Sequence, residues 1–367
     1  MNLFKKKRNL WSDFTISIDL NEILPTLNRG LSNIGFLFGA GTSYEAGYPL
    51  SRDLTIKTIS RLSEEEKEKV TEILSRENIE YEFNNGIPDI EVITDLILKY
   101  SLMDNQNQYK NLEDSIRKNI LDIINSIDSP NLDLHIKFLK SLKRLVGINP
   151  ETIFIFTTNY DLMFELAAKD SRIPLFNGFR GILFRYFDIN SLKLKYGTIE
   201  NNRIFKPTRE LRINLLKLHG SISWNKSSED ISEIADYKSI MADNCSIILP
   251  RKQKIRDTLD YPYDNLFRYA SQVIGSSKCK YLISCGYSFR DEHINELFII
   301  PKLQEGKIKF FALFKDEPDN IDIFTEYPNF NYLTKDKLYL NGIESNETTE
   351  IWKFSKFVDL LASKAGV

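Results

Sequence analysis

Cysteine and histidine are scarce in this chain, with three of each in 367 residues. The cysteines, Cys245, Cys279 and Cys285, include no Cys-x-x-Cys pair, so neither a disulfide framework nor a four-cysteine zinc site is available. No apolar run approaches the ~18 residues that a membrane-spanning helix needs. We therefore expect a cytoplasmic protein with no metal, no zinc and no membrane partner.

An excess of either charge is also absent, because 49 Lys and Arg residues face 51 acidic residues and leave a net charge of −2. That balance argues against a strongly basic nucleic-acid-binding protein. The basic run at residues 5–8 has no apolar stretch after it, which argues against a secretion signal. We interpret this run as a solvated N-terminal arm, with contact to a partner subunit or to nucleic acid as the alternative.

What the sequence does contain is a glycine-rich turn after a strongly apolar run. Residues 34–38 predict a buried parallel strand, and the turn after it consists of Gly39, Ala40, Gly41, Thr42 and Ser43. Glycine lets the backbone approach a ligand closely, while free N–H groups and a helix N-terminus attract a diphosphate. The alternative is an ordinary strand-to-helix turn, because Gly47 does not lie at the Rossmann spacing.

Three later apolar runs also end in polar or glycine-containing clusters. They cover residues 154–156, 215–218 and 282–285, and the clusters begin at Thr157, His219 and Gly286. Because ligands bind at the carboxyl edge of open parallel sheets, the four segments indicate one binding site. The pattern predicts an α/β fold, with a Rossmann-like parallel sheet and helices on both faces.

Taken in order, the four motifs resemble the sirtuin (silent information regulator) family of NAD-consuming enzymes. They read Gly-Ala-Gly-x-Ser at 39–43, Thr-Thr-Asn-Tyr-Asp at 157–161, Lys-Leu-His-Gly-Ser-Ile at 217–222 and Gly-Tyr-Ser-Phe-x-Asp-x-His-Ile-Asn at 286–295. The last three look most like the bacterial sirtuin-like NADases of antiphage defence. The resemblance covers about 34–52 and 152–295, and it implies NAD+ as the substrate.

The resemblance implies that Asn159 and His219 are the catalytic residues. The amide of Asn159 can hold a water or a ribose hydroxyl beneath the anomeric carbon. Unperturbed imidazole has a pKa of ~6.5, a value that suits a general base, so His219 can accept a proton from that hydroxyl or from an incoming water. Without the resemblance, Asn159 could cap the next helix and His219 could be structural.

The other motif residues are candidate NAD+ contacts. Besides the glycine turn, they are Arg52, Thr158, Asp161, Gly286 and Ser288. Asp161 could bind the nicotinamide carboxamide or cap the helix that follows, and both roles stay open. We expect His293 to be structural and Asp291 to cap a helix.

The chain departs from the deacylase pattern. Where deacylating sirtuins have Gly-Ile-Pro-Asp-Phe-Arg, residues 47–52 read Gly-Tyr-Pro-Leu-Ser-Arg, and Thr158 replaces the glutamine of Thr-Gln-Asn-Ile-Asp. A less shielded anomeric carbon and a missing zinc ribbon favour attack by water. We therefore expect NAD+ hydrolysis, with protein deacylation, ADP-ribosyl transfer or a non-catalytic NAD or ADP-ribose-binding subunit as alternatives. A cyclic product and an added nuclease activity stay open.

The periodicity also predicts how the chain is divided. We expect one catalytic domain over 1–367, with a Rossmann-like core at 34–52 and 151–367. Helical periodicity predicts an inserted helical module at 53–150, in which His135 is a packing residue. Residues 177–214 are rich in aromatic and basic side chains and predict a hairpin or loop with one buried face. Base stacking, self-assembly or a lid over the cleft are the alternatives for this segment.

An unregulated NADase would kill its own cell, so the resemblance also implies restraint. We expect a homo-oligomer that is activated by assembly or by a separate protein. Relatives of this build are often paired with a HerA-like hexameric ATPase or with a short Argonaute, and we favour the ATPase.

Overall fold

The computed structural model describes residues 20–79, 86–102, 108–148, 151–182, 184–200, 203–227, 230–251 and 258–367. The basic run at 5–8 lies outside them. A nine-stranded sheet forms the centre, in the order β16-β15-β14-β13-β12-β1-β2-β8-β3. Its strands are β1 Ile34–Phe38, β2 Thr152–Thr157, β3 Leu175–Phe176, β8 Arg212–Lys217, β12 Tyr281–Cys285, β13 Lys309–Leu313, β14 Phe330–Leu333, β15 Lys337–Leu340 and β16 Ile343–Asn346.

The strand order contains a topological switch point. Pairing is parallel from β14 to β3, and only β15 and β16 pair antiparallel. From β1 the chain first adds β2 and β8 on one side and later adds β12, β13 and β14 on the other. Because ligands bind outside the carboxyl ends of strands where the order reverses, the β1–β12 junction is the expected crevice. The predicted Rossmann-like α/β fold is confirmed.

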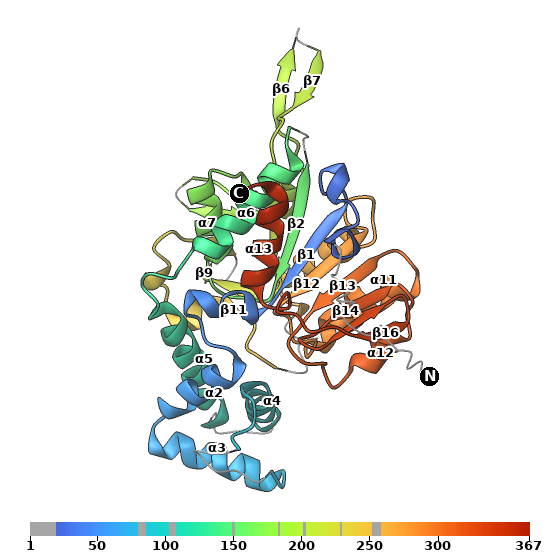
Figure 1. The fold of residues 1–367 in the computed structure, drawn as a ribbon. Helices are drawn as coiled ribbons and strands as arrows, with labels where there is room; N and C mark the ends of the chain where they lie inside the picture. The colour runs from blue at the N-terminus through green and yellow to red at the C-terminus, as the bar shows by residue number, and fades with distance from the viewer. Residues whose placement is uncertain are drawn as a thin grey trace, which may run out of the picture.

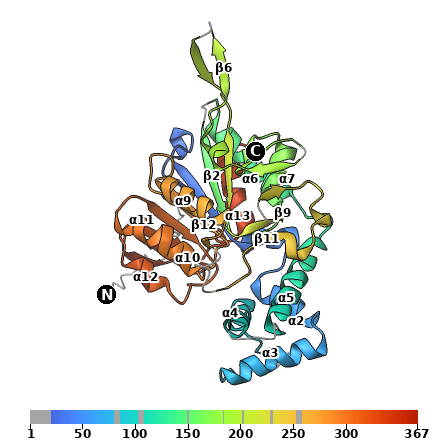
Figure 2. The same ribbon diagram turned by 180° about the vertical axis from the view of Figure 1, so that it is seen from behind.

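Helices cover both faces of this sheet, and the strands are buried on both. The helices α6 Asp133–Val146, α7 Met163–Ser171 and α13 Phe354–Ala365 pack on one face with Phe36 and Phe38. The opposite face carries α9 Tyr263–Val273 and the run α10 Glu292–Ile294, π-helix Asn295–Ile299 and α11 Ile300–Gln304. Figure 1 shows α6 and α13 in front of one face of the sheet, and Figure 2 shows α9 and α10 in front of the other face. Each fully buried phenylalanine contributes about 1.5–3 kcal/mol.

The chain segment that connects β1 to β2 forms a group of helices that extends away from the sheet (Figure 1). They are α2 Ser51–Ser60, α3 Glu64–Arg76, α4 Ile90–Ser101 and α5 Gln108–Asn125, and they share a separate hydrophobic cluster. Ser63 caps α3 through a capping box with Glu66, as this local sequence predicts. We expected residues 53–150 to form one inserted helical module. The last helix of this range, α6, packs on the sheet instead. Its residues Phe138, Leu139 and Leu142 share a hydrophobic cluster with Phe36 and Phe38 of β1.

A second, five-stranded sheet in the order β11-β9-β10-β5-β4 lies beyond β8. Its strands are β4 Phe179–Arg180, β5 Arg185–Phe187, β9 Gly220–Lys226, β10 Ile231–Glu233 and β11 Cys245–Ile247. The hairpin of β6 Gly197–Glu200 and β7 Ile204–Pro207 projects from the body with every residue exposed (Figure 1). Residues 177–214 thus contain both a packed part and a solvent-exposed part.

The remaining elements are short. They are α1 Leu20–Ile23, α12 Ile321–Thr325 and the 3-10 turns Leu27–Arg29, Ala40–Thr42, Tyr44–Ala46, Ile189–Lys193, Tyr237–Ser239 and Ala242–Asn244. Across the ranges given above, no helix combines the length and the apolar character that crossing a bilayer demands.

Candidate functional site

The four sequence motifs follow four neighbouring strands at the same edge of the sheet. Phe38, at the end of β1, pairs with Thr157 of β2 and with Cys285 of β12, while Thr157 pairs with Lys217 of β8. The residues after these strand ends therefore emerge side by side at the switch point. Asn159 and His219 each lie two positions beyond such a paired residue, on adjacent strands.

The glycine turn packs directly on the loop that follows β12. A Cβ atom on Gly41 would lie 2.7 Å from Gly286 Cα, and one on Gly39 would lie 2.5 Å from Gly286 O. Gly286 has φ of 65°, in the left-handed region that favours glycine. The N–H groups of Gly39 and Gly41 donate to Cys285 O and Gly286 O, at 3.3 and 3.1 Å. Three glycines thus allow two backbones to meet at the switch point.

The expected cradle of free N–H groups takes another form. The N–H groups of Thr42 and Ser43 donate to Gly39 O and Ala40 O, because the turn continues into short 3-10 turns. The first full helix after the turn, α2, begins only at Ser51. The N–H groups of Gly39, Gly41, Thr42 and Ser43 are therefore all bonded within the protein, and a diphosphate could use them only after this loop rearranges.

Asn159 is bound to the glycine turn. Its Nδ2 donates to Gly39 O at 3.1 Å, to Thr42 Oγ1 at 3.3 Å and to Ser43 Oγ at 3.0 Å. These contacts orient the amide and link the candidate catalytic residue to the candidate nucleotide loop. At the start of α7, the helix after β2, it is Asp161 and not Asn159 that accepts a backbone hydrogen bond. Asp161 Oδ1 accepts from the N–H of Met163 at 3.1 Å.

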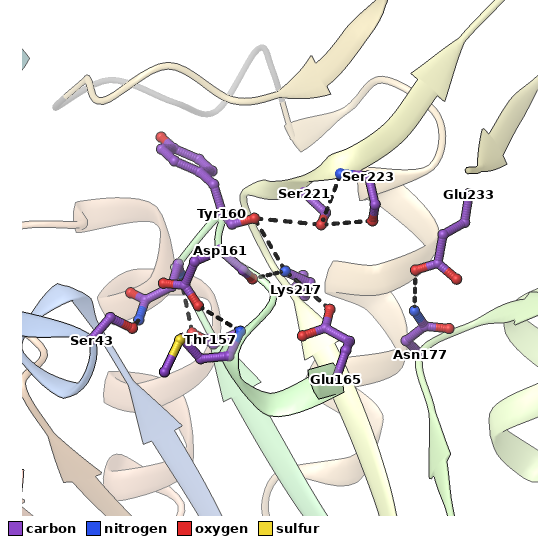
Figure 3. Close-up of polar contacts among 12 residues, drawn as sticks. Ser43, Thr157, Tyr160, Asp161, Glu165, Asn177, Lys217, Ser221, Ser223 and Glu233 are labelled. Atoms are coloured by element: carbon purple, nitrogen blue, oxygen red, sulfur yellow. Dashed lines mark hydrogen bonds and ion pairs between the residues drawn. The ribbon is translucent and has the colours of Figure 1, made fainter. Parts of the chain in front are cut away.

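A buried lysine holds the segment after β2, and sequence reasoning missed it. Lys217 has 1% of its surface exposed. Its ammonium donates to Tyr160 O at 3.2 Å, to Asp161 O, and to Glu165 Oε1 at 3.1 Å (Figure 3). Burial raises the pKa of Glu165, while the lysine charge acts in the opposite direction. A lysine inside the apolar run of a central strand was the signal, since a buried charge needs a partner.

His219 lies against two residues of the fourth motif. Its Nε2 is 3.1 Å from His293 Nε2 and 3.7 Å from Asp291 Oδ1, and all three residues are buried. The structural role expected for His293 stays a prediction, and Asp291 occupies the N-cap position of α10, as expected. Among the described residues, the Asp291 side chain makes no capping bond to α10, because the loop after β12 turns both groups toward His219. The Asp-x-His spacing beside the sheet edge was the available signal.

The other predicted contacts differ in exposure. Thr158 is half-buried, Ser288 is exposed after β12, and Arg52 is exposed on α2. Asn159, Asp161 and His219 are 8%, 8% and 3% exposed, so most of their surface is shielded from solvent. A cavity of about 450 Å³ lies elsewhere, between α5 and β11, and none of the predicted site residues lines it.

Comparison with known protein families identifies a domain in this chain. Residues 153–333 match a family model described as a SIR2-like domain. The matched range runs from β2 to the end of β14, so it includes Asn159, His219 and Gly286 but begins after the glycine turn. No curated protein shows significant sequence similarity to the chain.

Proposed function

We propose that this chain, sirtuin-like over residues 153–333, hydrolyses NAD+ to nicotinamide and ADP-ribose. The SIR2-like domain implies that NAD+ is used. The observation that carries the finer proposal is that Asn159 and His219 follow the paired ends of β2 and β8, with Asn159 bonded to the glycine turn. An amide and an imidazole at a switch point suit a reaction at the sugar carbon of a dinucleotide.

The reaction needs little covalent catalysis by the protein. The bond between nicotinamide and ribose breaks, and its electron pair neutralises the pyridinium. A water molecule forms the new bond to the anomeric carbon and releases one proton. The protein must orient the dinucleotide, hold the water and accept that proton.

Asn159 and His219 divide these tasks. The Nδ2 group of Asn159 is bonded to the glycine turn, so its Oδ1 is the atom assigned to the water or to a ribose hydroxyl. His219 accepts the proton through a ring nitrogen. Lys217 fixes the carbonyls of Tyr160 and Asp161 and thereby positions the segment that carries Asn159.

The burial of the site supports restraint in the resting protein. Both proposed catalytic side chains are under 10% exposed, and the N–H groups of Gly39, Gly41, Thr42 and Ser43 are bonded internally. We propose that assembly or a separate activator opens this site during phage infection and that the resulting NAD+ depletion is the defence. A HerA-like ATPase is the favoured activator and a short Argonaute the alternative.

The test follows nicotinamide release from NAD+ by purified protein, with and without the product of the neighbouring gene and with and without acetylated peptide. We expect peptide-independent release. Asn159→Ala and His219→Ala should each abolish it, while His135→Leu, a change at a buried histidine outside the site, should preserve it. Near-normal turnover in either site variant removes that residue from the mechanism. Peptide-dependent release would indicate a deacylase, and no release under any condition a binding subunit.

A further inference from the structure

Three buried side chains with metal-ligating atoms converge behind the sheet edge. They are His219, from the turn between β8 and β9, and Asp291 and His293, from the segment after β12. One ligand atom from each lies within 4.8 Å of the other two. Isolated acidic groups at a protein surface are common, but two imidazoles and a carboxylate buried together are not.

His219 Nε2 faces two potential metal-ligating atoms at once. His293 Nε2 lies 3.1 Å away and Asp291 Oδ1 lies 3.7 Å away from the same atom. One hydrogen between the two ring nitrogens serves their contact and leaves the carboxylate to interact elsewhere. A cation among the three would be approached by all three ligand atoms at once.

Two of the three separations are close to those expected around a single transition-metal ion. Zinc binds imidazole nitrogen and carboxylate oxygen at about 2.0–2.2 Å, so two ligands of one ion lie about 2.8–3.6 Å apart for right-angle to tetrahedral arrangements. The separation of 3.1 Å between the ring nitrogens falls within that interval, and the separation of 3.7 Å requires a small adjustment of Asp291. Magnesium and calcium prefer shells of oxygen ligands, which this group does not offer.

We propose that His219, Asp291 and His293 bind one divalent transition-metal ion of the zinc class, and that the bound ion keeps the enzyme inactive. This proposal departs from our expectation of no metal, which we argued from the lack of Cys-x-x-Cys pairs and without this histidine–aspartate group in view. The inhibitory part rests on the proposed function, because a ring nitrogen that ligates a metal cannot accept a proton from water. Removal of the ion then restores the general base.

The chain is well suited to a direct test because it contains only three histidines. The full chain, freed of any affinity tag and stripped with a chelator, is titrated with Zn²⁺ by calorimetry and with Co²⁺ by visible absorption. We expect one equivalent to bind. His293→Gln and Asp291→Asn should each weaken binding at least about tenfold, since loss of an outer-shell partner alone costs about 10–100-fold. His135→Leu is the matched control and should bind as the parent does.

Thermal unfolding of each variant shows whether it folds. The Asp291 and His293 variants are tested separately, so the metal site can still be tested if one of them misfolds. Absence of binding by the parent, or equal affinity in the parent and a folded ligand variant, would overturn the metal site. Nicotinamide release with added Zn²⁺ or chelator is measured separately. One bound Zn²⁺ without NAD+ hydrolysis under any condition would leave the metal site standing and refute the proposed function. NAD+ hydrolysis by a protein that binds no Zn²⁺, and that added Zn²⁺ does not slow, would refute the metal site and leave the proposed function standing.

Discussion

A methyl group on Gly286 tests whether the close approach of two loops builds the site. The added Cβ would lie 2.7 Å from both Gly41 Cα and Thr42 N, which are backbone atoms that cannot turn aside. Gly306 provides a matched control, since it also has φ of 65° but, among the described residues, nothing lies within 4 Å of its added Cβ. The two alanine variants therefore share the conformational penalty and differ in the steric contact.

The magnitudes follow from this comparison. Left-handed backbone costs a non-glycine residue about 1–2 kcal/mol, and the stiffer unfolded chain returns about 0.4–1 kcal/mol. Gly306→Ala should therefore lower the free energy of unfolding by about 1 kcal/mol. Gly286→Ala should lower it by about 1–3 kcal/mol more, as overpacking does, because the glycine turn must move.

Denaturant unfolding measures both free energies, and nicotinamide release measures the site. We expect Gly286→Ala to lose hydrolysis, because the moved turn carries the carbonyl and hydroxyls that orient Asn159, and we expect Gly306→Ala to keep it. Equal destabilisation of the two variants, or unimpaired hydrolysis by a folded Gly286→Ala protein, would refute the reasoning.

Two further predictions concern buried polar groups. Burial lowers the pKa of His135 from 6.5 to about 3, and neither ring nitrogen has a hydrogen-bond partner among the described residues. Between these pH values the unfolded chain binds one more proton than the folded protein, so the free energy of unfolding falls as the pH drops below 6.5. At pH 5 this lowers the free energy of unfolding by about 2 kcal/mol, and His135→Leu should abolish that decrease. Denaturant unfolding at pH 5 and pH 7 measures it. Lys217→Met should destabilise by about 3–5 kcal/mol, since the half-buried Glu165 and the carbonyls of Tyr160 and Asp161 lose their buried cation. Adding Glu165→Gln should recover part of this in a double-mutant cycle.

Much of the central architecture was readable from local sequence. The apolar runs that became β1, β2, β8 and β12 each end in polar residues or glycine, and a parallel sheet must present such ends at one edge. The capping box at Ser63 was equally readable, because it depends on residues three positions apart. The edge that carries Asn159 and His219 therefore followed from pattern and strand direction.

Other features depended on contacts between distant segments. The helix α6 looks like its neighbours in sequence, yet it packs on the sheet because Phe36 and Phe38 offer it an apolar face. The glycine turn was expected to leave its N–H groups free, but four of them are bonded. Two donate to carbonyls at Cys285 and Gly286, and those of Thr42 and Ser43 donate within the 3-10 turns. Periodicity describes one segment at a time and cannot say which partner a backbone group will find.

The sequence by itself determined the fold class and the sheet edge at which the motifs meet, because strand direction and apolar periodicity are local properties. Only the tertiary structure decided that His293, 74 residues beyond His219, faces it across a buried contact, and that Lys217 holds the segment after β2. Such pairings arise when separate elements pack, and the cost of burying a polar group without a partner selects among them.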